Sequence, residues 1–178
     1  QQKHKVREGY TIHDELTAVD IQKMQEELDY RRITLRPQLI EDVKTAREFG
    51  DLSENFEYKS AKREKNRNDS RIRYLERMIK TANVIEVSSS ADEAGLFDRV
   101  EIYIEEDDET QTIQLVTTLR QNALGGRISK ESPVGRAVLG HKVGDRVEVE
   151  TDAGYRYFIQ IRSITKGTDD ESLPISAY

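Results

Sequence analysis

Two long helical patterns separated by one short polar link constrain the fold of this chain more than any other feature. In the first pattern apolar residues recur at steps of three, four or seven: Ile21, Met24, Leu28, Leu35, Leu39, Val43 and Ala46. In the second, the steps alternate between three and four: Tyr58, Ala61, Lys65, Asn68, Ile72, Leu75, Ile79 and Ala82. Two such helices with a short connection form an antiparallel hairpin. A helix from about Thr17 to Phe49 would be roughly 50 Å long, so the link lies at the tip of a rod.

Residues at the helix ends give more local predictions. Thr17 is a candidate N-cap with Asp20 in the first turn, and Pro37 should kink the first helix near residues 33–36. Gly50 is well placed to end that helix in a left-handed conformation. Asp51 can then cap the second helix with Glu54 at its third position. Capping alone would explain both acids, although a capped carboxylate still presents its oxygens to solvent.

Charge is unevenly distributed along the rod. The 178-residue chain carries −6 overall, but residues 1–82 sum to +2 and residues 83–178 to −8. The segment 41–58 is acidic, whereas residues 59–80 carry nine Lys or Arg against three acids. The simpler interpretation is a solvated helix face with ion pairs along the rod. The alternative is a shaft that faces nucleic acid and presents carboxylates to a cation.

The pattern changes to a period of two after a Ser-rich stretch at 88–90. Alternating segments around Val100–Ile104, Ile113–Leu115, Val147–Val149 and Tyr157–Ile161 predict four strands, with an acidic hairpin turn at 105–109. Ser132 as N-cap, Pro133 at the first position and Gly140 after the end predict one short helix. The result is a small antiparallel sheet with one covering helix, and therefore an α+β chain. Residues 166–178 are predicted to be a disordered tail.

Composition excludes several classes of site. The chain has no cysteine, which removes disulfides and cysteine-based zinc sites, and its three histidines are far apart in sequence. No apolar run approaches the length of a membrane span and no secretory signal is present, so the cytoplasm is the expected compartment.

Several short motifs resemble the bacterial Gre transcript-cleavage factors. The stretch Gly50-Asp51-Leu52-Ser53-Glu54-Asn55-Phe56-Glu57-Tyr58 is similar to the GDLxENAEY tip motif of that family. Similarity continues upstream at Arg36-Pro37 and Ala46-Arg47-Glu48, and downstream at Ala61-Lys62 and Val84-Ile85. In the second half, residues 128–137 and 144–147 look like the family's C-terminal domain. Together the resemblance covers roughly residues 16–164.

The resemblance implies a specific organisation. A coiled-coil hairpin at 16–87, with its acidic tip near 50–58, follows an N-terminal extension at 1–15. A linker at 88–95 leads to an FKBP-like domain at 96–165 and then to an acidic and polar tail at 166–178. The family acts as a monomer on bacterial RNA polymerase: the C-terminal domain docks at the rim of the secondary channel and the hairpin enters it.

The same resemblance assigns roles to residues. Asp51 and Glu54 would help hold the second Mg²⁺ of the polymerase active site, so that the polymerase cleaves its own backtracked transcript; the chain would have no cofactor or complete active site of its own. Two further groups follow, of which the first would contact RNA or polymerase and the second would dock on polymerase: Arg47, Asn55, Tyr58, Lys62, Arg63 and Arg67; Ser132 and Pro133. Tyr58 is equally explained as a seam residue that closes the tip, and Ser132 as a helix cap.

Departures from the family pattern keep other functions open. Phe56 replaces a small residue of the motif, the segment 117–124 lacks the usual Gly- and acid-rich connection, and the N-terminus is longer by about ten residues. One alternative is a relative that enters the same channel and inhibits or modulates the polymerase without stimulating cleavage. A prolyl isomerase or peptide-binding module and a plain coiled-coil scaffold are the others; the scaffold predicts that amides at 51 and 54 leave all activity intact.

Overall fold

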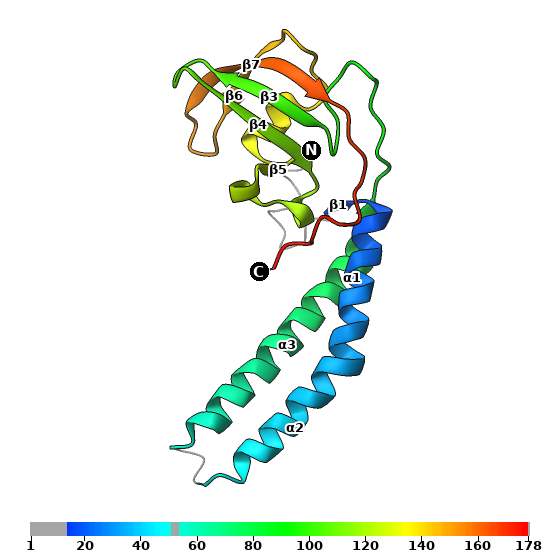
Figure 1. Cartoon of the computed structure of the whole chain (residues 1–178), viewed down its shortest axis with the longest axis vertical. Coiled ribbons are helices and arrows are strands. Elements are labelled where there is room, and N and C mark those ends of the chain that lie inside the picture. Colours follow the sequence, from blue (N-terminus) through cyan, green and yellow to red (C-terminus); the bar gives the residue numbers. More distant parts are fainter. Residues whose placement is uncertain (1–13, 51–53, 178) are drawn as a thin grey trace. The chain divides into compact units, whose positions relative to one another are not determined.

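A computed structural model describes residues 14–50 and 54–177 of the chain, which divide into two compact units. In its described part, the first unit comprises residues 21–50 and 54–82 and forms the helical hairpin (Figure 1). The second comprises Asp14–Asp20 and Asn83–Tyr178 and forms the globular unit. The chain passes from the globular unit into the hairpin within the first helix.

The first half of the hairpin is a single helical rod with one irregular turn. Helix α1 (Ala18–Tyr30) continues through a π-helical turn, η3 (Arg31–Leu35), into α2 (Arg36–Arg47). Thr17 is the N-cap as predicted, because its Oγ1 accepts a hydrogen bond from the backbone N–H of Asp20 at 3.2 Å. The side chain of Asp20 accepts in return from the N–H of Thr17 at 3.0 Å, which completes a capping box.

Pro37 disturbs the first helix where the sequence predicts it, and the disturbance takes the form of the π turn. In η3 the N–H of Arg36 donates to the carbonyl oxygen of Arg31, five residues earlier. The wider turn ends at the residue before Pro37, whose ring would otherwise clash with the preceding turn and which has no N–H to donate. The helix resumes without a break through Arg47.

The seam of the hairpin is apolar in part and polar in its middle. Helix α3 (Phe56–Thr81) buries Ile72 and Leu75 as predicted, together with Asn68. The amide of Asn68 accepts a hydrogen bond from Arg31 at 2.8 Å. Arg71, whose burial the sequence pattern does not predict, pairs with Glu27 at 2.7 Å. Ion pairs and amides therefore fill the part of the seam where apolar side chains are missing.

The globular unit is built on a five-stranded sheet with strand order β5-β4-β3-β7-β6. The strands are β3 (Arg99–Ile104), β4 (Glu109–Val116), β5 (Arg127–Ser129), β6 (Arg146–Glu150) and β7 (Arg156–Thr165). The four predicted strands are present and antiparallel. However, the prediction of a purely antiparallel sheet is wrong, because β5 pairs parallel to β4. Three residues are too few to show a period of two, so this strand is not visible in the sequence.

The core of this unit lies on one face of the sheet, covered by helix α4 (Pro133–Val138). Alternate residues of the strands, among them Val100, Ile102, Leu115 and Ile159, are buried there with Val138 of the helix. Ser132 caps α4 as predicted, accepting from the N–H of Gly135 at 3.1 Å. Gly135 packs against the β5 end: a Cβ atom there would lie 2.1 Å from the carbonyl oxygen of Ser129, so only glycine fits.

Both ends of the chain contribute to the globular unit. Strand β1 (Glu15–Leu16) pairs parallel to β2 (Asn83–Val84), so the prediction of an extension without regular structure is wrong for residues 15 and 16. Residues 1–13 lie outside the described part. The prediction of a disordered tail is wrong for residues 166–177. Gly167 donates its N–H to Asp98 at 2.9 Å, and Ser176 donates its N–H to the carbonyl oxygen of Leu119 at 2.6 Å.

A buried charge cluster ties these segments together. Arg120, at the end of a 3₁₀ turn over Thr118–Arg120, pairs with Asp20 at 2.8 Å and with Asp169 at 2.7 Å. Thr117 donates its hydroxyl to Asp20 at 2.8 Å, and Thr17 donates its own to Asp169 at 2.6 Å. The 117–124 connection that departs from the family pattern thus supplies the residue on which the N-terminal and C-terminal segments meet.

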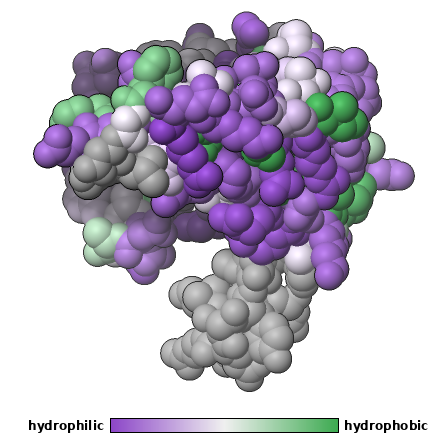
Figure 2. Space-filling model, turned by 90° about the horizontal axis from the view of Figure 1, so that it is seen from below, coloured by the Kyte–Doolittle hydropathy of each residue, from purple (hydrophilic) through white to green (hydrophobic). Residues whose placement is uncertain are grey.

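The surface is strongly polar, as the 35% charged composition predicts. Hydrophilic side chains cover most of the face in Figure 2, where hydrophobic side chains form small separate areas. Among the described helices, none is long and apolar enough to cross a membrane.

Candidate functional site

The two helices of the hairpin are held together at the tip by the side chain of Asn55. Its Oδ1 accepts a hydrogen bond from the N–H of Tyr58 at 3.0 Å, which makes Asn55 the N-cap of α3. Its Nδ2 donates to the carbonyl oxygen of Ala46 at 2.7 Å, in the last turn of α2. One amide therefore satisfies an unpaired donor of one helix and an unpaired acceptor of the other.

The predicted cap of the second helix is wrong, since Asn55 and not Asp51 occupies the N-cap position and Glu54 precedes the helix. Asp51 itself lies outside the described residues. Glu54 lies in a turn directly before the cap and its side chain is exposed. The first helix likewise ends at Arg47, before Gly50, although Gly50 does have a positive φ of 132°. The carboxylate of Glu54 is thus accessible to an external cation, and carboxylate oxygens are ligands that Mg²⁺ prefers.

Tyr58 lies between two cations of the predicted site. The guanidinium carbon of Arg47 lies 5.4 Å from the centre of the Tyr58 ring, and the ammonium of Lys62 lies 5.9 Å from it. A hydrogen bond from Arg47 is the main reason that the pKa of the Tyr58 phenol is lowered, with a smaller contribution from the charge of Lys62. The ring connects the end of α2 to the first turns of α3 through these cation–π contacts.

Further cations of the predicted site lie along one face of α3. We name this the α3 basic face; it lines a shallow groove formed by Lys59, Lys62, Arg63, Asn66, Arg67 and Ser70. Arg67 pairs with Glu64 at 3.3 Å, and both of these side chains are well exposed. Lys59 is a member that the residue assignment from resemblance misses. Its spacing of four residues from Arg63 is the signal that places it on the same face.

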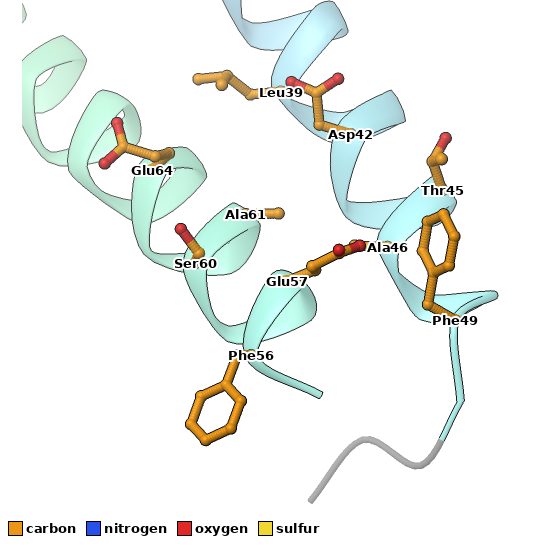
Figure 3. Close-up of a pocket in the computed structure, with 10 residues that line it drawn as sticks. All are labelled: Leu39, Asp42, Thr45, Ala46, Phe49, Phe56, Glu57, Ser60, Ala61 and Glu64. Carbon is orange, nitrogen blue, oxygen red and sulfur yellow. The ribbon is translucent and has the colours of Figure 1, made fainter. Parts of the chain in front are cut away.

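A second groove lies between α2 and α3 at the tip. Its volume is about 550 Å³, and it is lined by Leu39, Asp42, Thr45, Ala46, Phe49, Phe56, Glu57, Ser60, Ala61 and Glu64 (Figure 3). Figure 3 shows the Glu57 side chain extending between the helices toward Ala46, whereas the Phe56 ring points away from Ala61 and the α2 helix. Asp42, Glu57 and Glu64 make this groove acidic, in contrast to the α3 basic face.

The two residues predicted to dock on polymerase lie in the globular unit. Ser132 and Pro133 are half-buried at the start of α4. Besides capping the helix, Ser132 donates its hydroxyl to the carbonyl oxygen of Ser129 at 2.7 Å. Its hydroxyl therefore has partners within the domain, and what Pro133 and the exposed part of α4 offer a partner is mainly a shaped surface.

No cluster of three or more metal-ligating side chains exists among residues 14–50 and 54–177. A cation held by Glu54 would therefore take its remaining ligands from Asp51 or from another molecule. This donor set suits Mg²⁺, which is commonly bound by one or two carboxylates together with phosphate oxygens of a substrate.

The fold and the tip define a class of protein: a helical hairpin that displays an exposed carboxylate and a set of cations at its end, carried by a small mixed-sheet domain. Two family models match the chain, and together they span most of it. Residues 15–84 match "Transcription elongation factor, N-terminal", and residues 89–166 match "Transcription elongation factor, GreA/GreB, C-term".

Similar proteins of known name agree. Transcription elongation factor GreA of Thermoanaerobacter pseudethanolicus is 41% identical over 140 residues, covering 78% of this chain and 89% of the relative. GreA of Bacillus subtilis is 37% identical over 139 residues, covering 78% and 88%. The solved structure of the GreA factor homolog 1 protein of Thermus thermophilus is 26% identical, covers 87% of this chain and all of the other, and superposes with a TM-score of 0.40. The chain belongs to the GreA/GreB family of transcription elongation factors, and the resemblance seen in its sequence is confirmed.

Proposed function

We propose that this protein binds bacterial RNA polymerase in its secondary channel and stimulates cleavage of nascent RNA in backtracked complexes. The observation that carries the proposal is the tip itself: the exposed carboxylate of Glu54 directly precedes Asn55, which joins the ends of both helices. A carboxylate on a rigid support can be placed in a partner's active site at a small cost in conformational entropy.

Asp51 and Glu54 would hold a Mg²⁺ ion that they share with the polymerase. A second metal ion in such a site stabilises the attacking and leaving oxygens of a phosphodiester displacement. The chain would be no enzyme by itself, because its contribution is to supply and orient carboxylate oxygens while the polymerase holds the substrate.

The cations beside the tip suit the RNA that a backtracked complex extrudes. Arg47, Lys62, Arg63 and Arg67 lie from the end of α2 along α3, and contacts of Lys and Arg with phosphates are independent of base sequence. Binding to a backtracked complex should therefore weaken as salt is raised. Ser132 and Pro133, at the start of α4, would form part of the surface that docks at the channel rim.

One feature favours a second candidate, a channel binder that inhibits or modulates the polymerase without stimulating cleavage. Phe56 places a bulky ring, 80% exposed, two residues from Glu54, where the family motif has a small residue. A ring in that position could block the approach of a reacting group. Cleavage of RNA by the wild-type protein separates the two functions.

The test uses a stalled, backtracked bacterial elongation complex with a labelled transcript and Mg²⁺. The wild-type protein should release short 3′ fragments, whereas Glu54→Gln and the Asp51→Asn/Glu54→Gln double variant should not. Glu57→Gln is the matched control, because Glu57 is also an exposed acid of the tip and lies on the first turn of α3. All variants should bind the polymerase equally. A wild-type protein that binds and releases nothing, or slows elongation, is the inhibitory relative.

A further inference from the structure

Phe56 is the most exposed large apolar side chain of the described tip, and the hairpin does not use it for packing. It is 80% exposed, and its ring points away from α2 (Figure 3). It is the first residue of α3, whereas the buried seam of that helix begins with the half-buried Tyr58. A fully exposed aromatic ring adds nothing to the stability of the fold, so a role outside the hairpin explains it better.

The position of Phe56 on α3 continues the α3 basic face to the tip. Phe56, Lys59, Arg63 and Arg67 are separated by three, four and four residues, a spacing that places them on one face of a helix. The ammonium of Lys59 lies 5.7 Å from the centre of the Phe56 ring. At 1.5 Å per residue, the stripe from Phe56 to Arg67 extends about 16 Å. The helix thus presents an aromatic platform followed by a row of cations.

Charge indicates which kind of partner fits this stripe. Phe56 also lies at the rim of the groove between α2 and α3, but that groove carries Asp42, Glu57 and Glu64 and would repel a polyanion. The opposite side carries Lys59, Lys62 and Arg63. An exposed aromatic ring next to a row of cations is the combination that binds single-stranded nucleic acid: bases stack on the ring and phosphates pair with the cations.

We propose that the Phe56 ring stacks on an unpaired base of the extruded RNA strand whose phosphates contact the α3 basic face. This inference rests on the proposed function for the identity of the RNA, and it assigns a contact to the residue at which the chain departs from the family motif. The stacked base would lie two residues from Glu54, so Phe56 would act as a positioning residue for the RNA next to the carboxylate. Stacking needs no particular base, so the contact would be independent of sequence.

The experiment compares binding to two elongation complexes that differ only in extruded RNA. One is backtracked by several nucleotides; the other is held in the register that extrudes none. The concentration of protein at half-saturation is measured for wild type, Phe56→Leu and Phe56→Tyr. Phe49→Leu is the matched control, because Phe49 is 69% exposed at the tip but lines the acidic groove.

Stacking predicts that Phe56→Leu weakens binding to the backtracked complex by about 5-fold to 150-fold, the range for loss of one base–aromatic stack. Phe56→Tyr and Phe49→Leu should bind like wild type, and all variants should bind the complex without extruded RNA equally. An equal loss on both complexes would mean that Phe56 packs against polymerase protein and would overturn the proposal, as would no loss with Phe56→Leu. Self-association of the wild type that Phe56→Leu abolishes would instead assign the ring to a second copy of this chain.

This comparison does not depend on cleavage. A wild-type protein that releases no fragments, yet binds the backtracked complex through Phe56, would overturn the proposed stimulation of cleavage and leave the stacking contact in place. Cleavage that is unaffected by Phe56→Leu, with unchanged binding, would do the reverse.

Discussion

Arg120 and Asp20 form a fully buried ion pair, with the guanidinium Nε 2.8 Å from the carboxylate Oδ1 and neither side chain exposed to solvent. Asp20 also accepts hydrogen bonds from the N–H of Thr17 and from the hydroxyl of Thr117. The pair joins two segments of the globular unit that are a hundred residues apart in sequence. Breaking one partner of such a pair leaves an uncompensated charge in a medium of low dielectric constant.

We therefore predict that Asp20→Asn lowers the free energy of unfolding of the globular unit by about 3 kcal/mol or more. The substitution keeps the shape of the side chain but leaves Arg120 with Asp169 as its one carboxylate partner. Urea unfolding followed by circular dichroism measures the change. Glu148→Ala removes an exposed partner of Arg156 on the same unit and should cost less than about 0.5 kcal/mol. An equal effect of the two substitutions would contradict the assignment.

The double role of Asn55 predicts a graded effect at the tip. Asn55→Ala removes the N-cap of α3 and the bond to Ala46, so the first turn of α3 should lose about 1 kcal/mol of local stability. Asn55→Asp retains the acceptor for the N–H of Tyr58 but loses the donor to Ala46. Amide hydrogen exchange should therefore speed up at Tyr58 in the alanine variant and remain close to wild type there in the aspartate variant. Equal rates at Tyr58 in both variants would show that capping is not what protects it.

Gly135 should tolerate no larger residue. In Gly135→Ala the new Cβ would lie 2.1 Å from the carbonyl oxygen of Ser129, so α4 must shift away from β5. Overpacking of this kind costs about 1–3 kcal/mol, measurable as a lower urea midpoint. Arg136→Ala, at the next position and exposed, is the control and should leave the midpoint nearly unchanged. A midpoint for Gly135→Ala that matches the control would mean that α4 is not seated closely on β5.

Acid titration should reveal the fork between Arg146 and Glu105. Arg146 donates from Nε at 2.6 Å and from a terminal nitrogen at 2.9 Å, and Gln160 donates to the same carboxylate. These hydrogen bonds lower the pKa of Glu105 from 4.5 to about 2. Because the pKa is depressed in the folded state, the contact contributes stability above about pH 4.5 and loses it as the pH falls toward 2.

The measurement for Glu105 is the carboxyl carbon chemical shift by NMR as a function of pH. The midpoint in the wild type should lie well below 4.5, and Arg146→Ala should move it upward, since only Gln160 then donates. Added salt should shift the wild-type midpoint in the same direction, because the pair is exposed to solvent. An ordinary midpoint in the wild type would contradict the fork.

Much of the fold was predictable because local signals are strong in this chain. Thr17 and Ser132 are N-caps in the structure because their hydroxyls lie at the start of clear helical patterns, and the period of two locates four of the five strands of the main sheet. Pro37 indicates where the first helix becomes irregular, although the sequence does not reveal that a π turn absorbs the disturbance.

What the sequence did not predict depends on competition and on distance. Asp51 and Asn55 are both good N-cap residues within five positions, and propensity alone does not decide between them; the donor amide of Asn55, which reaches Ala46, distinguishes it. The partners of Arg120 lie a hundred residues before it and about fifty after it, so no local pattern reveals the cluster. The exposed Phe56 is visible in the sequence only as a departure from the motif.

The clasp that Asn55 forms with Ala46 and Tyr58 lies at the base of the turn rather than in it. The spacing of the two helix ends is set there, independently of the residues between Ala46 and Asn55. Those residues can therefore be exchanged like a cassette while the support beneath them stays the same. On such a scaffold, evolution can convert an activator into an antagonist of the same partner by changing a few side chains at the turn, without redesigning the rod that delivers them.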